Sequence, residues 1–132
     1  MPAFFDSNIV LYSVGSVPAK ADRSDALLAG GGWISVQVLN EIANVAQRKM
    51  RYSWARTRAL LDTLTALVEV VDLKQAVHRL GLLLAERFRL SVYDGMIVAA
   101  AVESGCDVLY SEDMHHGLVV AGRLRIENPF LG

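Results

Sequence analysis

The stretch SVYDGMIVAAAVESGCDVLYSED, residues 91–113, combines a helix signal, a strand signal and several acidic residues. It opens with a serine suited to the N-cap, and the apolar residues that follow predict a helix over 92–103, which a glycine closes. Residues 107–110 then predict a short strand that ends in a polar loop. Asp94 lies near the start of this helix, and Asp113 lies just after this strand. Acids in both places predict a polar site where strands end and helices begin.

The same alternation of strands and helices extends over the rest of the chain. Strands are expected at 3–5, 33–34, 68–71 and 124–127, the last as a half-exposed edge strand. Helices are expected at 9–11 (a short helix or turn), 20–29, 35–51, 53–67 and 72–87, the last with Asp72 as its cap. This alternation predicts an α/β fold with a mainly parallel central sheet that is covered on both faces.

Length and composition predict one globular domain over residues 1–132. Hydrophobic residues make up 53% of the chain and charged residues 20%, which excludes a disordered chain. Because this apolar fraction exceeds what one small core absorbs, we expect a homodimer or a complex with a partner. The formal net charge of -1 excludes a global positive field that would draw the protein to nucleic acid, although local basic clusters could still bind it.

Several features argue against a membrane protein. Asp6 interrupts the first apolar stretch before a signal peptide could form, and no basic segment precedes it. The longest uninterrupted apolar run, residues 96–102, is far too short to span a bilayer.

The single cysteine, Cys106, excludes an intramolecular disulfide and is expected in the core. We therefore expect a cytoplasmic protein.

Four acidic residues carry the main chemical signal: Asp6, Glu41, Asp94 and Asp113. Each also suits an ordinary structural role, which is a helix cap, a turn or a solvated helix face. Asp94, however, leads an apolar stripe, so its carboxylate is directed toward the core, where it requires a partner. Two like charges about 4 Å apart repel by roughly 4 kcal/mol at an effective dielectric constant of about 20. If the four meet, either a divalent cation such as Mg²⁺ or Mn²⁺ offsets the repulsion or some pKa values rise sharply.

Four segments resemble the motif blocks of PIN-domain ribonucleases, in particular VapC-type toxins of toxin–antitoxin pairs. They are FDSNI at 5–9, SVQVLNEIA at 35–43, SVYDGMIVAAA at 91–101 and LYSED at 109–113. The ending IENPF, residues 126–130, is also similar to theirs, so the resemblance covers essentially the whole chain. It implies a three-layer α/β/α sandwich (PIN-like) and a Mg²⁺-dependent endoribonuclease that is usually dimeric and is held inactive by a cognate antitoxin.

The resemblance also implies roles for the four acids. Asp6 and Asp94 would ligate Mg²⁺ directly, and Asp113 would do so directly or through water. Mn²⁺ is an alternative ion. Glu41 would position or deprotonate the water that attacks the RNA phosphodiester bond.

Three neighbouring residues are expected to support this site. Ser111 takes the family's hydroxyl position and would hydrogen-bond a carboxylate or the phosphate, and Asn8 would support the site through its amide. Glu112 is an additional acid beside Asp113, which leaves open which of the two faces the metal.

A basic cluster at the junction of two expected helices could hold RNA phosphates. Its members are Arg48, Lys49 and Arg51, followed by Arg56 and Arg58. The alternative is an ordinary solvated helical hairpin. Tyr52 and Trp54 lie within the cluster and could stack on bases or on an antitoxin helix, but core packing or a dimer contact is the favoured interpretation for Trp54.

The histidines are expected outside the site. His115 and His116 follow Asp113 on a polar loop, but neighbouring histidines without a cysteine partner do not provide a zinc-type cage. They are therefore interpreted as surface residues. His78 lies within an expected helix, where a structural role is expected.

Two other functions stay open at this point. A receiver-like signalling domain also gathers carboxylates and Mg²⁺ at strand ends, but it needs an acidic pair after the first strand and a lysine at the end of the last. Here Ser7 follows Asp6, and no lysine lies near residues 124–127. The second alternative is a catalytically inactive PIN-like binding module, against which the four acidic positions argue.

Overall fold

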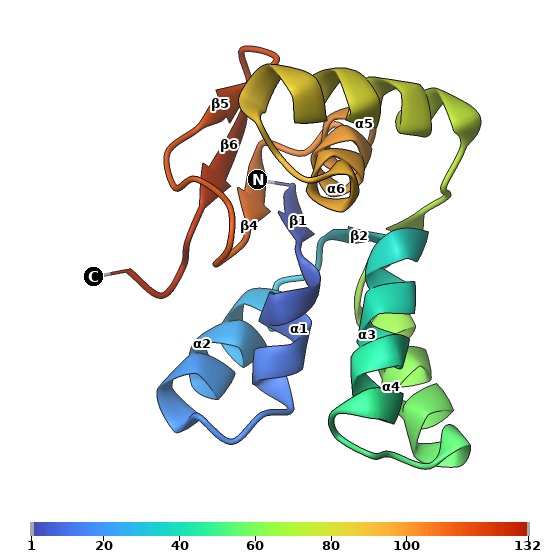
Figure 1. Ribbon diagram of the computed structural model, residues 1–132. Helices are drawn as coiled ribbons and strands as arrows, with labels where there is room; N and C mark the ends of the chain where they lie inside the picture. The colour runs from blue at the N-terminus through green and yellow to red at the C-terminus, as the bar shows by residue number, and fades with distance from the viewer. Residues whose placement is uncertain (1, 132) are drawn as a thin grey trace.

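Six strands form one sheet through the middle of the protein, in a computed structural model that describes residues 2–131. They are Ala3–Phe5 (β1), Trp33–Ser35 (β2), Glu69–Val71 (β3), Val108–Tyr110 (β4), Val119–Val120 (β5) and Leu124–Glu127 (β6). Their order in the sheet is β3-β2-β1-β4-β6-β5 (Figure 1). Every pair is parallel except β5 with β6. The predicted, mainly parallel sheet is confirmed.

Six helices of the described residues surround this sheet. They are Ser7–Ser13 (α1), Pro18–Ala29 (α2), Val36–Arg48 (α3), Trp54–Leu67 (α4), Gln75–Phe88 (α5) and Val92–Glu103 (α6). In Figure 1, α5 and α6 lie together on one side of the sheet, whereas α1 to α4 lie on the other. The arrangement is the predicted three-layer α/β/α fold. None of these helices, which together cover the helical part of residues 2–131, is long and apolar enough to cross a membrane.

Three of the predicted helix boundaries need correction. The third helix, α3, ends at Arg48 and does not continue to Arg51, because Arg51 has a φ of 56° that a right-handed helix cannot accommodate. The second, α2, begins two residues earlier than expected, at Pro18, since proline suits the first turn. Asp72 does not cap α5, which begins at Gln75 after an N-cap residue whose side chain makes no capping bond.

The C-terminal strands also differ from the prediction. β6 is not an edge strand, because Ile126 is paired with Leu109 of β4 on one side and Leu124 with Val120 of β5 on the other. The edge strand β5 was not predicted, since two residues carry no periodicity. The half-exposed pattern of β6 arises because Leu124 and Ile126 point into the core while Arg125 points to solvent.

Two packing features position the candidate site. Phe5 at the end of β1 pairs with Tyr110 at the end of β4, so the residues that follow these strands emerge side by side. α5 and α6 approach closely through glycines, because a Cβ atom on Gly95 would lie 2.5 Å from the carbonyl oxygen of Gly81. This contact sets the place of the first turn of α6. Cys106 is buried, as expected.

Candidate functional site

Asp6 lies at the carboxyl end of the central strand β1 and serves as the N-cap of α1. Its Oδ1 accepts a 2.8 Å hydrogen bond from the backbone N–H of Ser7, and its Oδ2 accepts a 2.6 Å bond from the hydroxyl of Ser111. Burial raises the pKa of Asp6 from 3.8 to about 6; the two hydrogen bonds oppose this shift, and the charges of Asp94 and Glu41 add to it. The capping role therefore holds, but it does not account for a buried carboxylate beside two other acids.

Glu41 projects from α3 and is held by two residues that the sequence analysis did not assign to the site. The hydroxyl of Ser7 donates a 2.8 Å bond to Oε1 of Glu41, and Nε2 of Gln37 donates a 3.2 Å bond to Oε2. The same Nε2 donates a 2.8 Å bond to the backbone carbonyl of Tyr93. Gln37 could have been found from its position one helical turn before Glu41, whereas the contact of Ser7 required the fold.

Asp94 occupies the first turn of α6, where its backbone N–H donates a 3.0 Å bond to the Ser91 hydroxyl. Its side chain is half-buried. Burial raises the pKa of Asp94, the charges of Glu41 and Asp113 raise it further, and the Ser91 hydroxyl opposes the shift. Asp94 is thus a helix-start residue and also a member of the acidic group.

Asp113 and Glu112 take different directions after β4. Asp113 is exposed, its Oδ2 accepts a 3.0 Å bond from the Asn8 amide, and its charge reaches Asp94. Glu112 instead accepts a 2.5 Å bond from Nζ of Lys20, which makes an ion pair. A second 2.5 Å bond comes to Glu112 from the hydroxyl of Tyr12. The hydrogen bonds from Lys20 and Tyr12 lower the pKa of Glu112. The geometry therefore favours Asp113 as the acid that faces the site.

The four carboxylates fit a hard divalent cation by their chemistry. Every donor atom is oxygen, and the charges of these acids act on one another. No ion pair within residues 2–131 neutralises them, since the pairs that form are Lys20–Glu112, Arg123–Asp107 and Arg125–Glu127. Within the same residues, no three His, Cys, Asp or Glu side chains surround one point that could hold a metal. Ion binding would therefore require the carboxylates to turn toward a common centre.

The predicted basic cluster lies at the end of α3 and in the turn to α4. Arg48, Lys49 and Arg51 are exposed, and Arg48 lies about two helical turns beyond Glu41. The guanidinium of Arg56 lies 3.9 Å from the centre of the Tyr52 ring. Core packing of Trp54 is contradicted by its exposure of 63%, since it stands on the first turn of α4, where no core element covers it.

All three histidines lie at the surface. His115 and His116 are exposed, as expected, and Nδ1 of His116 accepts a 3.0 Å bond from the backbone N–H of Asn128. His78 is also exposed and lines a cavity of about 570 Å³ between α3, α5 and α6.

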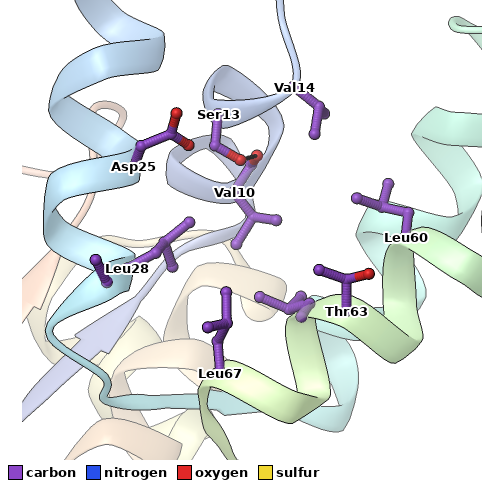
Figure 2. A pocket seen from close by; sticks show the side chains of 10 residues that line it. Val10, Ser13, Val14, Asp25, Leu28, Leu60, Thr63 and Leu67 are labelled. Carbon is purple, nitrogen blue, oxygen red and sulfur yellow. Dashed lines mark hydrogen bonds between the residues drawn. The ribbon is translucent and has the colours of Figure 1, made fainter.

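A separate cavity of about 270 Å³ lies between α1, α2 and α4. Figure 2 shows Val10, Leu28 and Leu60 on three sides of it, with the carboxylate of Asp25 at its margin. Leu67, which is 50% exposed, lies at the α4 side. An apolar cavity with exposed leucine at its margin is a surface suited to an apolar partner segment.

Comparison with known proteins places this arrangement in context. The family model described as PIN domain matches residues 3–118. A search of curated proteins gives no match. The toxin–antitoxin complex from Klebsiella pneumoniae is similar to this chain with a TM-score of 0.73 and 19% identity, over 97% of this chain and 98% of that one.

Two further solved structures are similar in fold. DNA-bound VapBC from Salmonella typhimurium has a TM-score of 0.69 and 20% identity, over 98% of each chain. The sarcin-ricin loop cleaving toxin VapC20 from Mycobacterium tuberculosis has a TM-score of 0.67 and 17% identity, over 84% of this chain and 89% of that one. At these identities the likeness concerns the fold.

Proposed function

Because this chain belongs to the PIN domain family, we propose that it is a Mg²⁺-dependent endoribonuclease that hydrolyses RNA phosphodiester bonds as the toxin of a toxin–antitoxin pair. The observation that carries the proposal is the group formed by Asp6, Glu41, Asp94 and Asp113. Their charges act on one another, and no lysine or arginine of residues 2–131 forms an ion pair with them. Such a group is costly for a small domain unless it serves a cation.

Asp6, Asp94 and Asp113 are the residues that would hold Mg²⁺ or Mn²⁺. The chemistry supplied by such an ion, when bound, is activation of a water molecule and stabilisation of charge on the phosphate. The Ser111 hydroxyl holds one oxygen of Asp6, and the Asn8 amide holds one oxygen of Asp113. These bonds hold the two carboxylates near the candidate site.

Glu41 is the candidate for accepting a proton from the attacking water. Ser7 and Gln37 hold both of its oxygens, so the carboxylate is fixed in place before substrate arrives. Fixed orientation of a general base lowers the barrier because less ordering is needed in the transition state.

RNA phosphates would be held by the exposed side chains of Arg48, Lys49 and Arg51, which lie at the end of the helix that carries Glu41 and just after it. Replacing Arg48 and Lys49 with Glu should weaken RNA binding. The slope of the logarithm of the binding constant against the logarithm of salt concentration should become shallower by about one for each lost phosphate contact. Arg79→Glu, on the exposed face of α5, is the matched control and should have little effect. Unchanged affinity in the double variant would remove this cluster from the proposal.

A cognate antitoxin is the proposed protein partner. Similar chains were solved in toxin–antitoxin complexes. The cavity between α1, α2 and α4 offers an apolar surface that none of the four candidate acids lines. Leu67→Glu should weaken binding of the antitoxin without reducing RNA cleavage, because Leu67 lies outside the acidic group. If Leu67→Glu loses both antitoxin binding and RNA cleavage, the proposal that the antitoxin binds at this cavity is contradicted. The homodimer stays a prediction, which analytical ultracentrifugation can test.

The decisive experiment is RNA cleavage by the purified protein with Mg²⁺, with Mn²⁺ and with EDTA. Asp6→Asn and Asp94→Asn are compared with Asp62→Asn, which removes an exposed acid from α4. Cleavage should require the metal, disappear in the first two variants and persist in the third. If the wild type cuts no RNA once any partner is removed, the chain is a PIN-like binding module without catalysis. If all three variants cut RNA as well as the wild type, Asp6 and Asp94 have only structural roles and the proposed metal site is wrong.

A further inference from the structure

A second cavity, with a mainly apolar lining, adjoins the candidate site and is not used by the proposed catalytic residues. It has a volume of about 570 Å³ and lies between α3, the start of α5 and the start of α6. This volume is in the range of pockets that bind small organic groups. Gln37 lines it and is also hydrogen-bonded to Glu41 at 3.2 Å, so the cavity and the acidic group share one wall.

The lining combines an aromatic ring with groups that form hydrogen bonds and with the apolar side chains of Leu73, Val92 and Met96. Tyr93 directly precedes Asp94, lines the cavity and is 68% exposed. Gln37 is 8% exposed, and its hydrogen bonds within residues 2–131 use only the amide nitrogen, which leaves its carbonyl oxygen as an acceptor. Gln75 and His78 add further polar groups from α5. An exposed ring beside fixed hydrogen-bonding groups suits a planar heterocycle.

The charge of the lining suits an anionic ligand. Lys74 supplies a positive charge, and none of the described residues that line the cavity is acidic, although the candidate metal-binding acids are adjacent. A nucleotide bound here would keep its phosphate near Lys74 and avoid the repulsion that the acids exert. Because Gln37 lines the cavity and is hydrogen-bonded to Glu41, the adjoining phosphodiester bond would reach the acidic group.

We propose that this cavity is a nucleotide-binding subsite, in which an unstacked base of single-stranded RNA lies on the Tyr93 ring while the neighbouring phosphodiester bond occupies the acidic site. This inference rests on the proposed nuclease function, and it names the feature of the substrate that this function would select. The subsite accepts a base that is free of pairing, so paired RNA is excluded by shape.

The test compares two probes that differ only in their bases. One is a fluorescent uridine decamer, and the other is an abasic ribose-phosphate decamer of the same length, both titrated in EDTA so that no cleavage occurs. Tyr93→Ala should weaken binding of the uridine decamer about tenfold and leave the abasic decamer unchanged. Tyr93→Phe keeps the ring and should keep most of the affinity. Equal effects on the two probes, or none, would overturn the subsite.

Two further measurements test the role of Lys74 and the oligomeric state of the Tyr93→Ala variant. Lys74→Met should weaken binding of both decamers. Arg79→Met, which removes an exposed cation from the helix that follows Lys74, should weaken binding of neither. If Tyr93→Ala converts a dimer into a monomer in ultracentrifugation, the cavity belongs to a contact between two copies and the proposal fails. Absence of cleavage with retained Tyr93-dependent binding would refute the nuclease function alone. Cleavage with Tyr93-independent binding would refute the subsite alone.

Discussion

The hydroxyl of Ser111 donates a 2.6 Å hydrogen bond to Oδ2 of Asp6, and this bond joins the residues that directly follow two neighbouring parallel strands. Both side chains are buried, so the bond is protected from competing water. It also lowers the pKa of Asp6 against the opposing effect of burial. The pair therefore links the centre of the sheet to the ionisation of a proposed metal ligand.

Ser111→Ala should shift the pH dependence of RNA cleavage. Removing the hydroxyl removes one influence that lowers the pKa of Asp6, so this pKa should rise above about 6. If ionised Asp6 is required, the acid limb of the pH–rate profile moves to higher pH. The measurement is the initial cleavage rate across this range, with Ser104→Ala as control because Ser104 bonds only to groups outside the site. If the acid limb of the pH–rate profile does not move, the Ser111 hydroxyl does not influence the ionisation on which cleavage depends.

Asp6→Asn should change how stability depends on pH when no metal is present. The folded pKa of about 6 exceeds the ordinary value of 3.8, so the folded state binds more protons between these values. The wild-type free energy of unfolding therefore loses a contribution of about 3 kcal/mol as pH rises through this window. Asparagine does not titrate, so the free energy of unfolding of the variant should rise relative to that of the wild type as pH rises through the same range. Urea unfolding in EDTA at several pH values measures this difference, and a constant difference would contradict the raised pKa.

Mg²⁺ should stabilise the wild type but not Asp94→Asn. An ion that binds only the folded state adds about 2.7 kcal/mol when its concentration is a hundred times the dissociation constant. Thermal unfolding with MgCl₂, compared with NaCl of equal ionic strength, gives a readout that is independent of cleavage. Equal Mg²⁺-dependent stabilisation of the two proteins would show that Asp94 is not a ligand.

Glu112→Gln and Asp113→Asn should have different effects on Mg²⁺ affinity. Glu112 is engaged by Lys20 and Tyr12, and its ion pair is partly exposed, so losing it should alter Mg²⁺ affinity by less than about fivefold. Lys20→Met should behave in the same way. Asp113→Asn should weaken Mg²⁺ binding about tenfold or more. Calorimetric titration distinguishes the two, and the reverse order would identify Glu112 as the ligand.

Gly95→Ala should destabilise the fold and disturb the site. The added Cβ would lie 2.5 Å from the Gly81 carbonyl oxygen and 2.8 Å from Cβ of Ala85, so α5 and α6 must separate. Overpacking of this kind costs about 1–3 kcal/mol. Since Asp94 is the preceding residue, Mg²⁺ binding should weaken as well. Gly30→Ala is the control, because Gly30 has a φ of -75° and its nearest contact would be 3.4 Å; an equal loss in both variants would exclude the helix contact as the cause.

Much of the site could be proposed from the sequence because parallel strands end at the same edge of a sheet. Asp6 and Ser111 follow apolar runs that form neighbouring strands, and Asp94 follows a serine cap. The contact between Ser7 and Glu41 could not be proposed in this way, since 34 positions separate the two residues and no pattern relates them. The direction of Glu112 toward Lys20 was likewise decided by the packing of α2 against α1.

The sequence by itself determined the alternation of strands and helices, the parallel sheet and the identity of the four acids. These features depend on local periodicity, on capping residues and on the rule that consecutive strands with intervening helices run in parallel. Only the tertiary structure decided that β6 lies inside the sheet, that Asp6 is buried enough to raise its pKa to about 6, and that Gln37 joins Glu41 to a second cavity. The physical reason is that burial and electrostatic coupling depend on distances between elements, which a one-dimensional pattern does not contain.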